Sequence, residues 1–153
     1  MSNNITVIIP IHKLEEKYIN GCVESIKNQK TIPDQVLIVR SDDTNLTKFL
    51  ETYDFGDLKE ITKVIHNETG NYDFQSQINY GVERCETEYF TFVEYDDELS
   101  PIWIKNGSEY IDSYPEVGVF LPIVYETDEN GQFISFTNES VWAKEFSEVM
   151  GVL

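Results

Sequence analysis

Four carboxylates lie within five residues of this chain, in the segment 94–98. Carboxylate oxygens are the ligands that Mg²⁺ and Mn²⁺ prefer, and these ions keep positions open for phosphate oxygens. The segment follows an aromatic and β-branched run, 89–93, which predicts a strand. Because side chains alternate along a strand, we expect Glu94 and Asp96 to lie on the same side and to face one divalent ion, Mn²⁺ or Mg²⁺. A solvated acidic loop is the simpler alternative.

The overall charge of the chain also suggests a bound cation. The chain has 11 Lys and Arg residues against 28 Asp and Glu residues, a formal net charge of −17. Such a surface repels phosphate and disfavours direct nucleic-acid binding through a basic face. An anionic ligand therefore requires a cation between its phosphates and the carboxylates, where the metal would act as a Lewis acid on a diphosphate leaving group. Solubility alone is the competing explanation of the acidity.

The elements that must position this cluster form an alternating series. Apolar, β-branched runs predict buried strands, and apolar residues three and four apart predict amphipathic helices. The expected strands are 5–10, 35–39, 63–65 and 89–93, and the expected helices are 14–29, 46–53, 74–84 and 101–114. This order predicts an α/β fold with a mostly parallel sheet covered on both faces.

The last forty residues carry a different pattern. Short apolar runs predict strands at 117–120, 123–125 and 132–136, and a final helix that holds Trp142. The segment 128–131 predicts a tight hairpin turn, because Asn-Gly readily takes positive φ values.

Length and composition suggest one domain spanning 1–153. No apolar run approaches the roughly 20 residues that span a bilayer. The N-terminus lacks the basic start and apolar core of a signal peptide, so we expect a cytoplasmic protein. Cys22 and Cys85 are far from any Cys-x-x-Cys spacing, and we expect two buried free thiols.

Six segments occur in an order that is specific as a set. They are the segments 5–13, 22–29, 79–82, 88–97, 115–119 and 128–131. Pro101 follows the fourth of these segments, four positions after Asp97. In this order they resemble segments of family 2 glycosyltransferases, among them the opening strand, the first helix, the Asn-x-Gly helix and the strand that leads to the metal-binding Asp-x-Asp-Asp. The resemblance covers nearly the whole chain. It implies a GT-A fold, a Rossmann-like three-layer sandwich.

The resemblance also implies a ligand and a reaction. A nucleotide-diphosphate sugar would bind through a divalent metal, and single displacement would transfer the sugar with inversion. Glu94 and Asp96 would contact the metal and the ribose or phosphate, Asp97 would support them, and Pro10 and Ile11 would line the base pocket. The residues implied in nucleotide-sugar binding are Pro10, Ile11, Ser41, Asp42, Asn79, Glu94 and Asp96.

Three features depart from the family's pattern. Glu94 replaces the first aspartate of the metal motif, and Arg40 and Ser41 stand where the second strand usually ends in paired aspartates, with Asp42 and Asp43 further along. The sequence also stops where the acceptor-binding half would follow. We therefore expect a truncated or reduced member without the acceptor and base region. Inverting transfer needs a base for the acceptor hydroxyl, and the late candidates are Glu139, Glu145 and Glu148.

Two functions remain open. The chain could be a small glycosyltransferase that takes its acceptor site or base from a protein partner or from a second copy of itself. It could instead be a catalytically inactive GT-A scaffold that serves as a structural or interaction subunit of a larger assembly. The retained acidic cluster favours the first function, and the missing acceptor half favours the second. A plain Rossmann-type nucleotide binder is disfavoured, because no glycine-rich phosphate loop follows the first strand.

Overall fold

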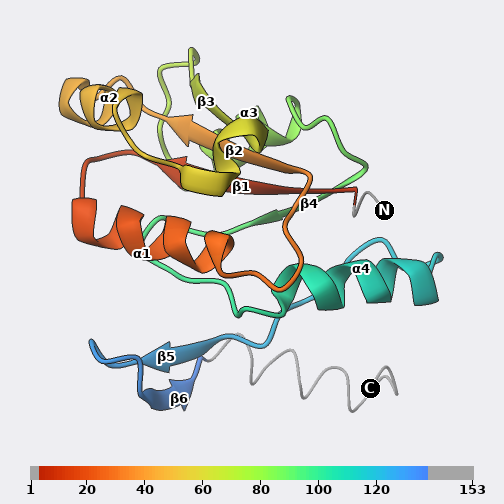
Figure 1. Ribbon diagram of the computed structural model, residues 1–153. Helices are drawn as coiled ribbons and strands as arrows, with labels where there is room; N and C mark the ends of the chain where they lie inside the picture. Colours follow the sequence, from red (N-terminus) through yellow and green to blue (C-terminus); the bar gives the residue numbers. More distant parts are fainter. Residues whose placement is uncertain (1–3, 138–153) are drawn as a thin grey trace. The chain divides into compact units, whose positions relative to one another are not determined.

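The computed structural model describes residues 4–137. Their contacts divide the chain into two compact units, with the division between Ser113 and Tyr114. The first unit contains a four-stranded sheet and its helices, and the second contains a two-stranded hairpin (Figure 1). The expectation of a single domain over 1–153 stays a prediction.

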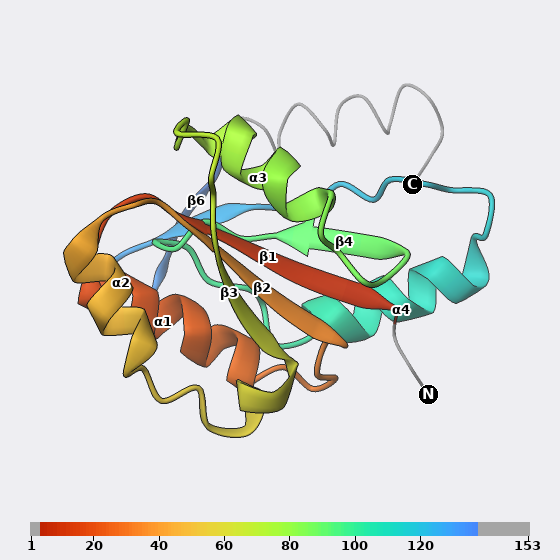
Figure 2. The same cartoon turned by 90° about the horizontal axis from the view of Figure 1, so that it is seen from above.

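The sheet of the first unit is entirely parallel. Its strands are β1 (Ile5–Ile11), β2 (Gln35–Arg40), β3 (Thr62–His66) and β4 (Tyr89–Phe92), in the order β3-β2-β1-β4. Figure 2 shows β1 between β2 and β4. All seven residues of β1 are buried, as its continuous apolar run predicts for a central parallel strand.

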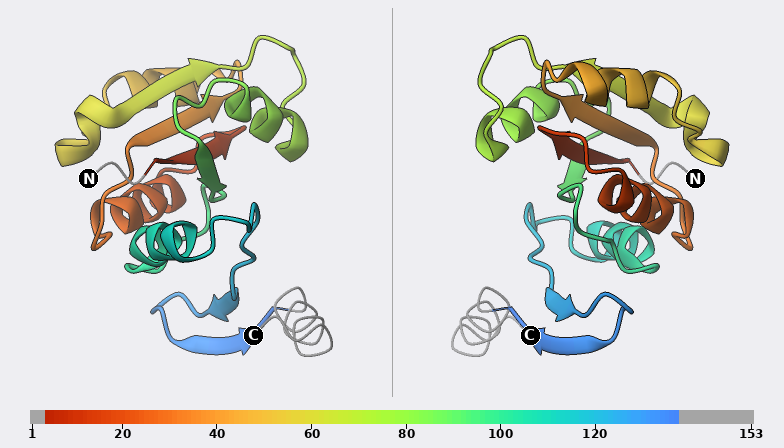
Figure 3. Two further views of the ribbon diagram at one scale, coloured as in Figure 1. Left: turned by 90° about the vertical axis from the view of Figure 1, so that its right-hand side faces the viewer. Right: turned by 90° about the vertical axis from the view of Figure 1, so that its left-hand side faces the viewer.

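Helices cover both faces of this sheet, which confirms the predicted α/β architecture. They are α1 (Glu16–Lys27), α2 (Thr44–Glu51), the 3-10 helix η1 (Gly56–Ile61), α3 (Phe74–Val82) and α4 (Trp103–Ser113). Figure 3 shows α1 and α2 on one side of the sheet and α3 on the other. Because side chains alternate along β1, Val7 and Ile9 pack in the cluster with α1 and α2, whereas Ile8 packs in the cluster with α3.

A glycine allows α3 to lie close to the sheet. A Cβ atom on Gly81 would come 2.9 Å from Ile8 Cγ2 and 3.1 Å from Val39 Cγ2, both closer than ordinary carbon contacts. The absence of a side chain at Gly81 therefore sets the depth at which the preceding turn of α3 meets the carboxyl ends of the strands. The glycine of the Asn-x-Gly motif therefore allows α3 to pack closely on the sheet.

The second unit contains an antiparallel hairpin of β5 (Tyr125–Thr127) and β6 (Phe133–Phe136). The expected turn is present: the backbone N–H of Gly131 donates to Asp128 O at 2.9 Å, and the Asp128 side chain accepts from Asn130 N and Gln132 N at 2.8 Å each. Within the turn only Gly131 has a positive φ, 77°, so Asn130 does not share the left-handed conformation that the Asn-Gly pair predicted.

Two strand predictions in this unit are wrong. Residues 117–120 form no strand, and the strand expected at 123–125 begins only at Tyr125. Val119 and Ile123 are 74% and 75% exposed, so these side chains do not pack on a sheet. Residues with a high β-propensity form strands only where such packing is available. The predicted helix with Trp142 lies outside the described residues. In the part of the chain that is described, no helix has both the length and the apolar character needed to cross a membrane.

Candidate functional site

The acidic segment lies at the carboxyl edge of the sheet, as expected, but in a different local conformation. Strand β4 ends at Phe92, and the N–H of Asp97 donates to Glu94 O at 3.0 Å, which closes a turn over residues 94–97. We call these residues the acidic turn. Strand alternation therefore does not orient Glu94 and Asp96. Instead, Tyr95 is buried in the core, and Glu94, Asp96 and Asp97 are exposed.

Charges within the acidic turn affect the ionisation of Glu94 and Asp97. Partial loss of water contact, followed by the charges of Asp96 and Asp97, raises the pKa of Glu94, while His12 opposes the rise. Loss of water contact and the charge of Asp96 likewise raise the pKa of Asp97. Within residues 4–137, no three such side chains converge as a closed metal cage. The turn therefore concentrates negative charge without enclosing a metal site by itself.

Helix α1 supports the segment that follows the acidic turn. Ser25 Oγ accepts a hydrogen bond from Leu99 N at 3.1 Å. Gln29 Nε2 donates to Ser100 O at 2.7 Å, and Gln29 Oε1 accepts from Ile104 N at 3.1 Å. Ser25 and Gln29 therefore both hold the loop between the acidic turn and α4.

A cavity of about 230 Å³ opens beside the acidic turn, on the α3 side of the sheet. We call it the α3 cavity. Residues at the ends of β1 and β4 line one part of it, and residues at the start of α3 line the other. They are Pro10, His12, Tyr72, Asp73, Phe74, Gln77, Glu94 and Tyr95. The ring of His12 lies 5.5 Å from that of Tyr95 in an edge-on arrangement. Acidic and apolar groups thus share one concave surface, as small-ligand sites commonly do.

Only some of the residues predicted to bind a nucleotide sugar line the α3 cavity. Pro10 and Glu94 line the α3 cavity. Ile11 has no exposed surface and packs on the opposite face of the sheet, since it is adjacent to Pro10 on the strand. Ser41 is buried, donates to His12 O at 2.8 Å and accepts from Asp43 N at 3.3 Å, so its hydroxyl links two loops.

Two further predicted residues lie outside the wall of this cavity. Asp42 is exposed and does not line the cavity, but it lies close to Tyr72, which does. Loss of water contact, and then the charge of Asp42, raise the pKa of the Tyr72 hydroxyl. Asn79 is exposed on α3 and lines neither this cavity nor the groove described below. The late carboxylates Glu139, Glu145 and Glu148 lie outside the described residues.

The sequence did not identify the α3 side of the cavity. Phe74 is 43% exposed and lines the cavity, and its ring centroid lies 5.4 Å from that of Phe92. Gln77 was not singled out, although it is buried on α3. A usable signal was present at Asp73, whose carboxylate accepts from Ser76 N at 2.7 Å and thereby caps α3.

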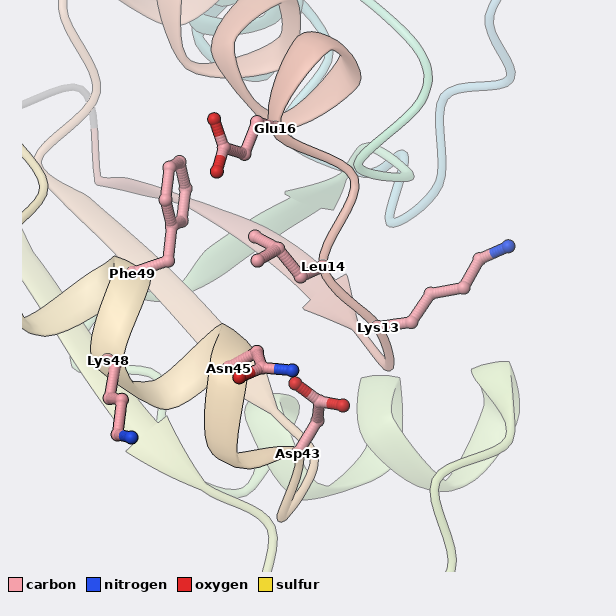
Figure 4. Close-up of a pocket in the computed structure, with 7 residues that line it drawn as sticks. All are labelled: Lys13, Leu14, Glu16, Asp43, Asn45, Lys48 and Phe49. Carbon is pink, nitrogen blue, oxygen red and sulfur yellow. The ribbon is translucent and has the colours of Figure 1, made fainter.

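A second depression, the α2 groove, has a volume of about 540 Å³. It is lined by Lys13, Leu14, Glu16, Asp43, Asn45, Lys48 and Phe49. Figure 4 shows the Lys13 and Lys48 side chains extending in different directions, so their ammonium groups do not converge. The Asp43 carboxylate is already engaged, because it accepts from Leu46 N at 2.6 Å as the cap of α2. The α2 groove therefore lacks a set of polar groups aimed at one ligand.

Comparison with known proteins identifies the family of the chain. Residues 6–150 match the family described as Glycosyl transferase family 2. The chain belongs to glycosyltransferase family 2. It is 31% identical over 133 residues to a teichoic acid poly(glycerol phosphate) polymerase of Staphylococcus epidermidis, covering 86% of this chain and 18% of that protein. It is 27% identical over 128 residues to an uncharacterized glycosyltransferase of Haemophilus influenzae, covering 81% of this chain and 38% of that protein. The family 2 chain thus spans half or less of the length of these relatives.

Solved structures confirm the GT-A fold. Crystal structures of S. aureus TarS resemble the chain with TM-scores of 0.55 for TarS and 0.58 for its residues 1–349 in complex with UDP. The sequence identities are 25% and 24%, over 74% and 75% of this chain and 20% and 33% of the TarS chains. A third structure holds TarS 1–349 in complex with UDP-GlcNAc, with a TM-score of 0.56 and 24% identity over 75% of this chain and 32% of that chain.

Proposed function

We propose that this chain is the donor-binding part of an inverting glycosyltransferase and that it binds a nucleotide-diphosphate sugar through a divalent metal. The observation that carries the proposal is the acidic turn, in which Glu94 lines the α3 cavity and the charges of Asp96 and Asp97 act on Glu94. The complexes of TarS with UDP and UDP-GlcNAc support it by analogy of fold. The diphosphate lies at the acidic turn, and the base lies further into the cavity.

The donor set fits Mn²⁺ or Mg²⁺. Magnesium is usually held by one or two carboxylates together with substrate phosphates, so a site that closes only with the diphosphate needs no cage of three protein groups. Glu94 and Asp96 would hold the ion, with Asp97 behind them. When bound, the metal would neutralise the charge that develops on the departing diphosphate. Loss of water contact is the main cause that raises the pKa values of Glu94 and Asp97, and a cation would relieve the repulsion that adds to it.

Sugar transfer also requires a catalytic base, and we identify none among the described residues. An acceptor hydroxyl attacks the anomeric carbon on the side opposite the diphosphate, and its proton passes to a base. We propose that this base comes from a protein partner, from a second copy of the chain or from Glu139, Glu145 or Glu148. The relatives' greater length is consistent with an acceptor half supplied by further sequence.

An inactive scaffold is the second candidate. The observation in its favour is the apolar stretch of the second unit, where Val119, Leu121 and Ile123 are all exposed. Contiguous exposed apolar side chains are typical of protein–protein contact surfaces. In this alternative the GT-A unit binds or assembles without transferring sugar.

Calorimetry with UDP in the presence and absence of Mn²⁺ tests donor binding. We expect binding that depends on the metal and that weakens at least about tenfold in Asp96→Ala, since removing even a supporting group of a metal site costs 10- to 100-fold. Asp57→Ala, which removes an equal charge from the exposed start of η1, is the matched control and should bind as the wild type does. Equal binding by wild type and Asp96→Ala would reject the proposal.

A transfer assay separates the enzyme from the scaffold. Incubation with donor sugars and Mn²⁺, with and without candidate acceptors, should release nucleoside diphosphate if the chain, alone or as a dimer, is active. Binding without release favours the scaffold or the need for a protein partner. The same transfer assay on the purified assembly distinguishes these two cases, because only an enzyme completed by its partner releases nucleoside diphosphate there.

A further inference from the structure

Hydrogen bonds attach the acidic turn to its surroundings on both sides. Before the turn, Val93 N donates to Ile8 O of β1 at 3.1 Å. After it, Leu99 N donates to Ser25 Oγ of α1 at 3.1 Å. The first bond joins two backbone groups and is independent of side-chain type, whereas the second requires a hydroxyl at one position of α1. The carboxyl side of the turn is therefore the side that a single substitution can release.

The Ser25 hydroxyl is oriented for this bond. It donates its own proton to Cys22 O, 2.7 Å away, so its lone pairs are left for the N–H of Leu99. The serine thus connects the backbone of α1 with the backbone just after the acidic turn.

Gln29 continues the attachment two positions beyond the end of α1. Its Nε2 donates to Ser25 O at 3.1 Å and to Ser100 O at 2.7 Å, and its Oε1 accepts from Ile104 N at 3.1 Å. Gln29 is 6% exposed, so water competes little for these bonds. We call Ser25 and Gln29 the α1 clamp, because both bind backbone groups of residues 99–104.

The α1 clamp is separate from the contacts that hold α1 on the sheet, which are made by the buried residues Ile19, Cys22, Val23 and Ile26. The clamp is directed instead at a segment that runs close to α1. A Cβ atom on Gly21 would come 2.9 Å from Glu98 Oε1. Burial, and then the charge of Asp97, raise the pKa of the Cys22 thiol, which places Asp97 near the same helix.

We propose that Ser25 and Gln29 are positioning residues for donor binding: the α1 clamp fixes the acidic turn in the conformation that accepts a metal-bound diphosphate. This inference rests on the proposed function. It gives a role in binding to two residues that line neither the α3 cavity nor the α2 groove and that act through the backbone of residues 99–104.

The chemistry of the site makes its geometry important. Mg²⁺ demands nearly octahedral coordination, so two carboxylates and a diphosphate can complete it only if the carboxylates are already well placed. Loss of water contact, and then the charge of Asp96, raise the pKa of Asp97, so these carboxylates repel each other unless a cation lies between them. Without the clamp, the turn would relieve this repulsion by moving its carboxylates apart. Bringing them together again would be a cost of binding.

Calorimetry with UDP and with inorganic pyrophosphate, each with Mn²⁺, tests the proposal. Ser25→Ala removes the acceptor of Leu99 N and leaves the apolar face of α1 intact. We expect this variant to bind both ligands about tenfold more weakly, since groups that support a metal site from behind contribute roughly 10- to 100-fold to affinity. Gln29→Leu removes two bonds to residues 99–104 and should weaken binding further. Ser25→Thr keeps the hydroxyl and should bind as the wild type does.

A control of similar stability separates positioning from a general structural role. Thr62→Val also removes one hydroxyl that donates to a backbone carbonyl, Leu58 O at 2.8 Å, but at the amino end of β3. We expect Ser25→Ala and Thr62→Val to remain folded with modestly lower urea midpoints, and only Ser25→Ala to lose affinity.

Three results would overturn the proposal while leaving the proposed function intact. They are wild-type binding by Ser25→Ala or Gln29→Leu, an equal loss of affinity in Thr62→Val, and binding by Ser25→Thr as weak as that by Ser25→Ala. If the wild type binds neither ligand, the proposed function fails as well.

Discussion

The two faces of the parallel sheet differ in how completely they are packed. Among the described residues, sixteen buried apolar side chains form the cluster on the α1 and α2 face, against five on the α3 face. The larger cluster includes Tyr95 and Val93, so it holds the acidic turn from beneath. The smaller cluster leaves space at the carboxyl edge, and the α3 cavity occupies that space. One face is therefore the more extensively packed, and the other carries the α3 cavity.

The buried glutamines on the two faces of the sheet also differ in their hydrogen bonding. On the α1 face, Gln29 is buried and both its side-chain oxygen and nitrogen are hydrogen-bonded. On the α3 face, Gln77 is equally buried, and its oxygen has no partner. The Gln29 side chain therefore completes the hydrogen bonding of its face, whereas the Gln77 oxygen is buried without a partner.

The largest expected effect of this difference is on stability. Ile26 is 0% exposed in the α1 cluster, and Ile78 is 9% exposed in the α3 cluster. Large-to-small changes of this kind cost about 2–5 kcal/mol, more where the surroundings cannot relax into the cavity. We expect Ile26→Ala to cost about 4 kcal/mol and Ile78→Ala about 2 kcal/mol. Urea unfolding of both variants measures the difference, and equal costs would contradict the distinction between the faces.

The two cysteines provide a second comparison, because each packs on one face. Burial, and then the charges of Asp97 and Glu98, raise the pKa of the Cys22 thiol to about 12. Burial also raises the pKa of Cys85, but Cys85 is only half-buried beside the α3 cluster. Since the thiolate is the reactive form, Cys22 should react only when the α1 face opens.

At pH 8 we expect a soluble thiol reagent to label Cys85 at least about a hundredfold faster than Cys22. Mass spectrometry of the two peptides over time measures both rates in one sample. The Cys85→Ser variant, which leaves Cys22 as the only thiol, serves as the control and should label at the slow rate. Comparable rates for the two cysteines would mean that the α1 face opens as readily as the α3 face.

Sequence patterns predicted the sheet well because its strands are buried on both faces. The run around Ile8 and the run around Leu37 are continuous and apolar, and only a central parallel strand buries every residue of such a run. The prediction failed at 117–120, where a similar pattern forms no strand. An apolar pattern indicates that a segment can join a sheet, but a neighbouring strand is needed to form one, and the neighbour is not written in the local sequence.

The site was predicted in part for a related reason. The carboxylates of the acidic turn are adjacent in sequence, so their proximity needed no knowledge of the fold. Their orientation did, because the chain turns at Glu94 instead of continuing as a strand. The α3 wall brings Gln77 beside Pro10, 67 positions away, and this contact depends on how closely Gly81 lets the helix approach the sheet. Helical periodicity identifies a buried residue, but it does not show whether a cavity lies beside it.

The smallest expected effect concerns the cap of α3. The hydrogen bond from Ser76 N holds the pKa of the Asp73 carboxyl below its ordinary value of 3.8. A carboxyl with a depressed pKa in the folded state stabilises that state at pH values above its unfolded pKa. This stabilisation is lost as the pH falls through the folded pKa, because the folded protein then takes up the proton as well. The contribution of Asp73 should therefore be constant near neutral pH and disappear below about pH 3.8.

Asp73→Asn isolates this contribution, because asparagine also caps helices but does not titrate. We expect wild type to be more stable than the variant near neutral pH and the difference to shrink as the pH falls below 3.8, as measured by urea unfolding at several pH values. Asp112→Asn, on the exposed side of α4, removes the same charge without touching α3 and controls for net charge. A difference that grows towards acid would mean that Asp73 is protonated more readily in the folded protein. In that case the cap would not hold a carboxylate, and the negative charge on the cavity wall would come from Glu94 alone of the lining residues.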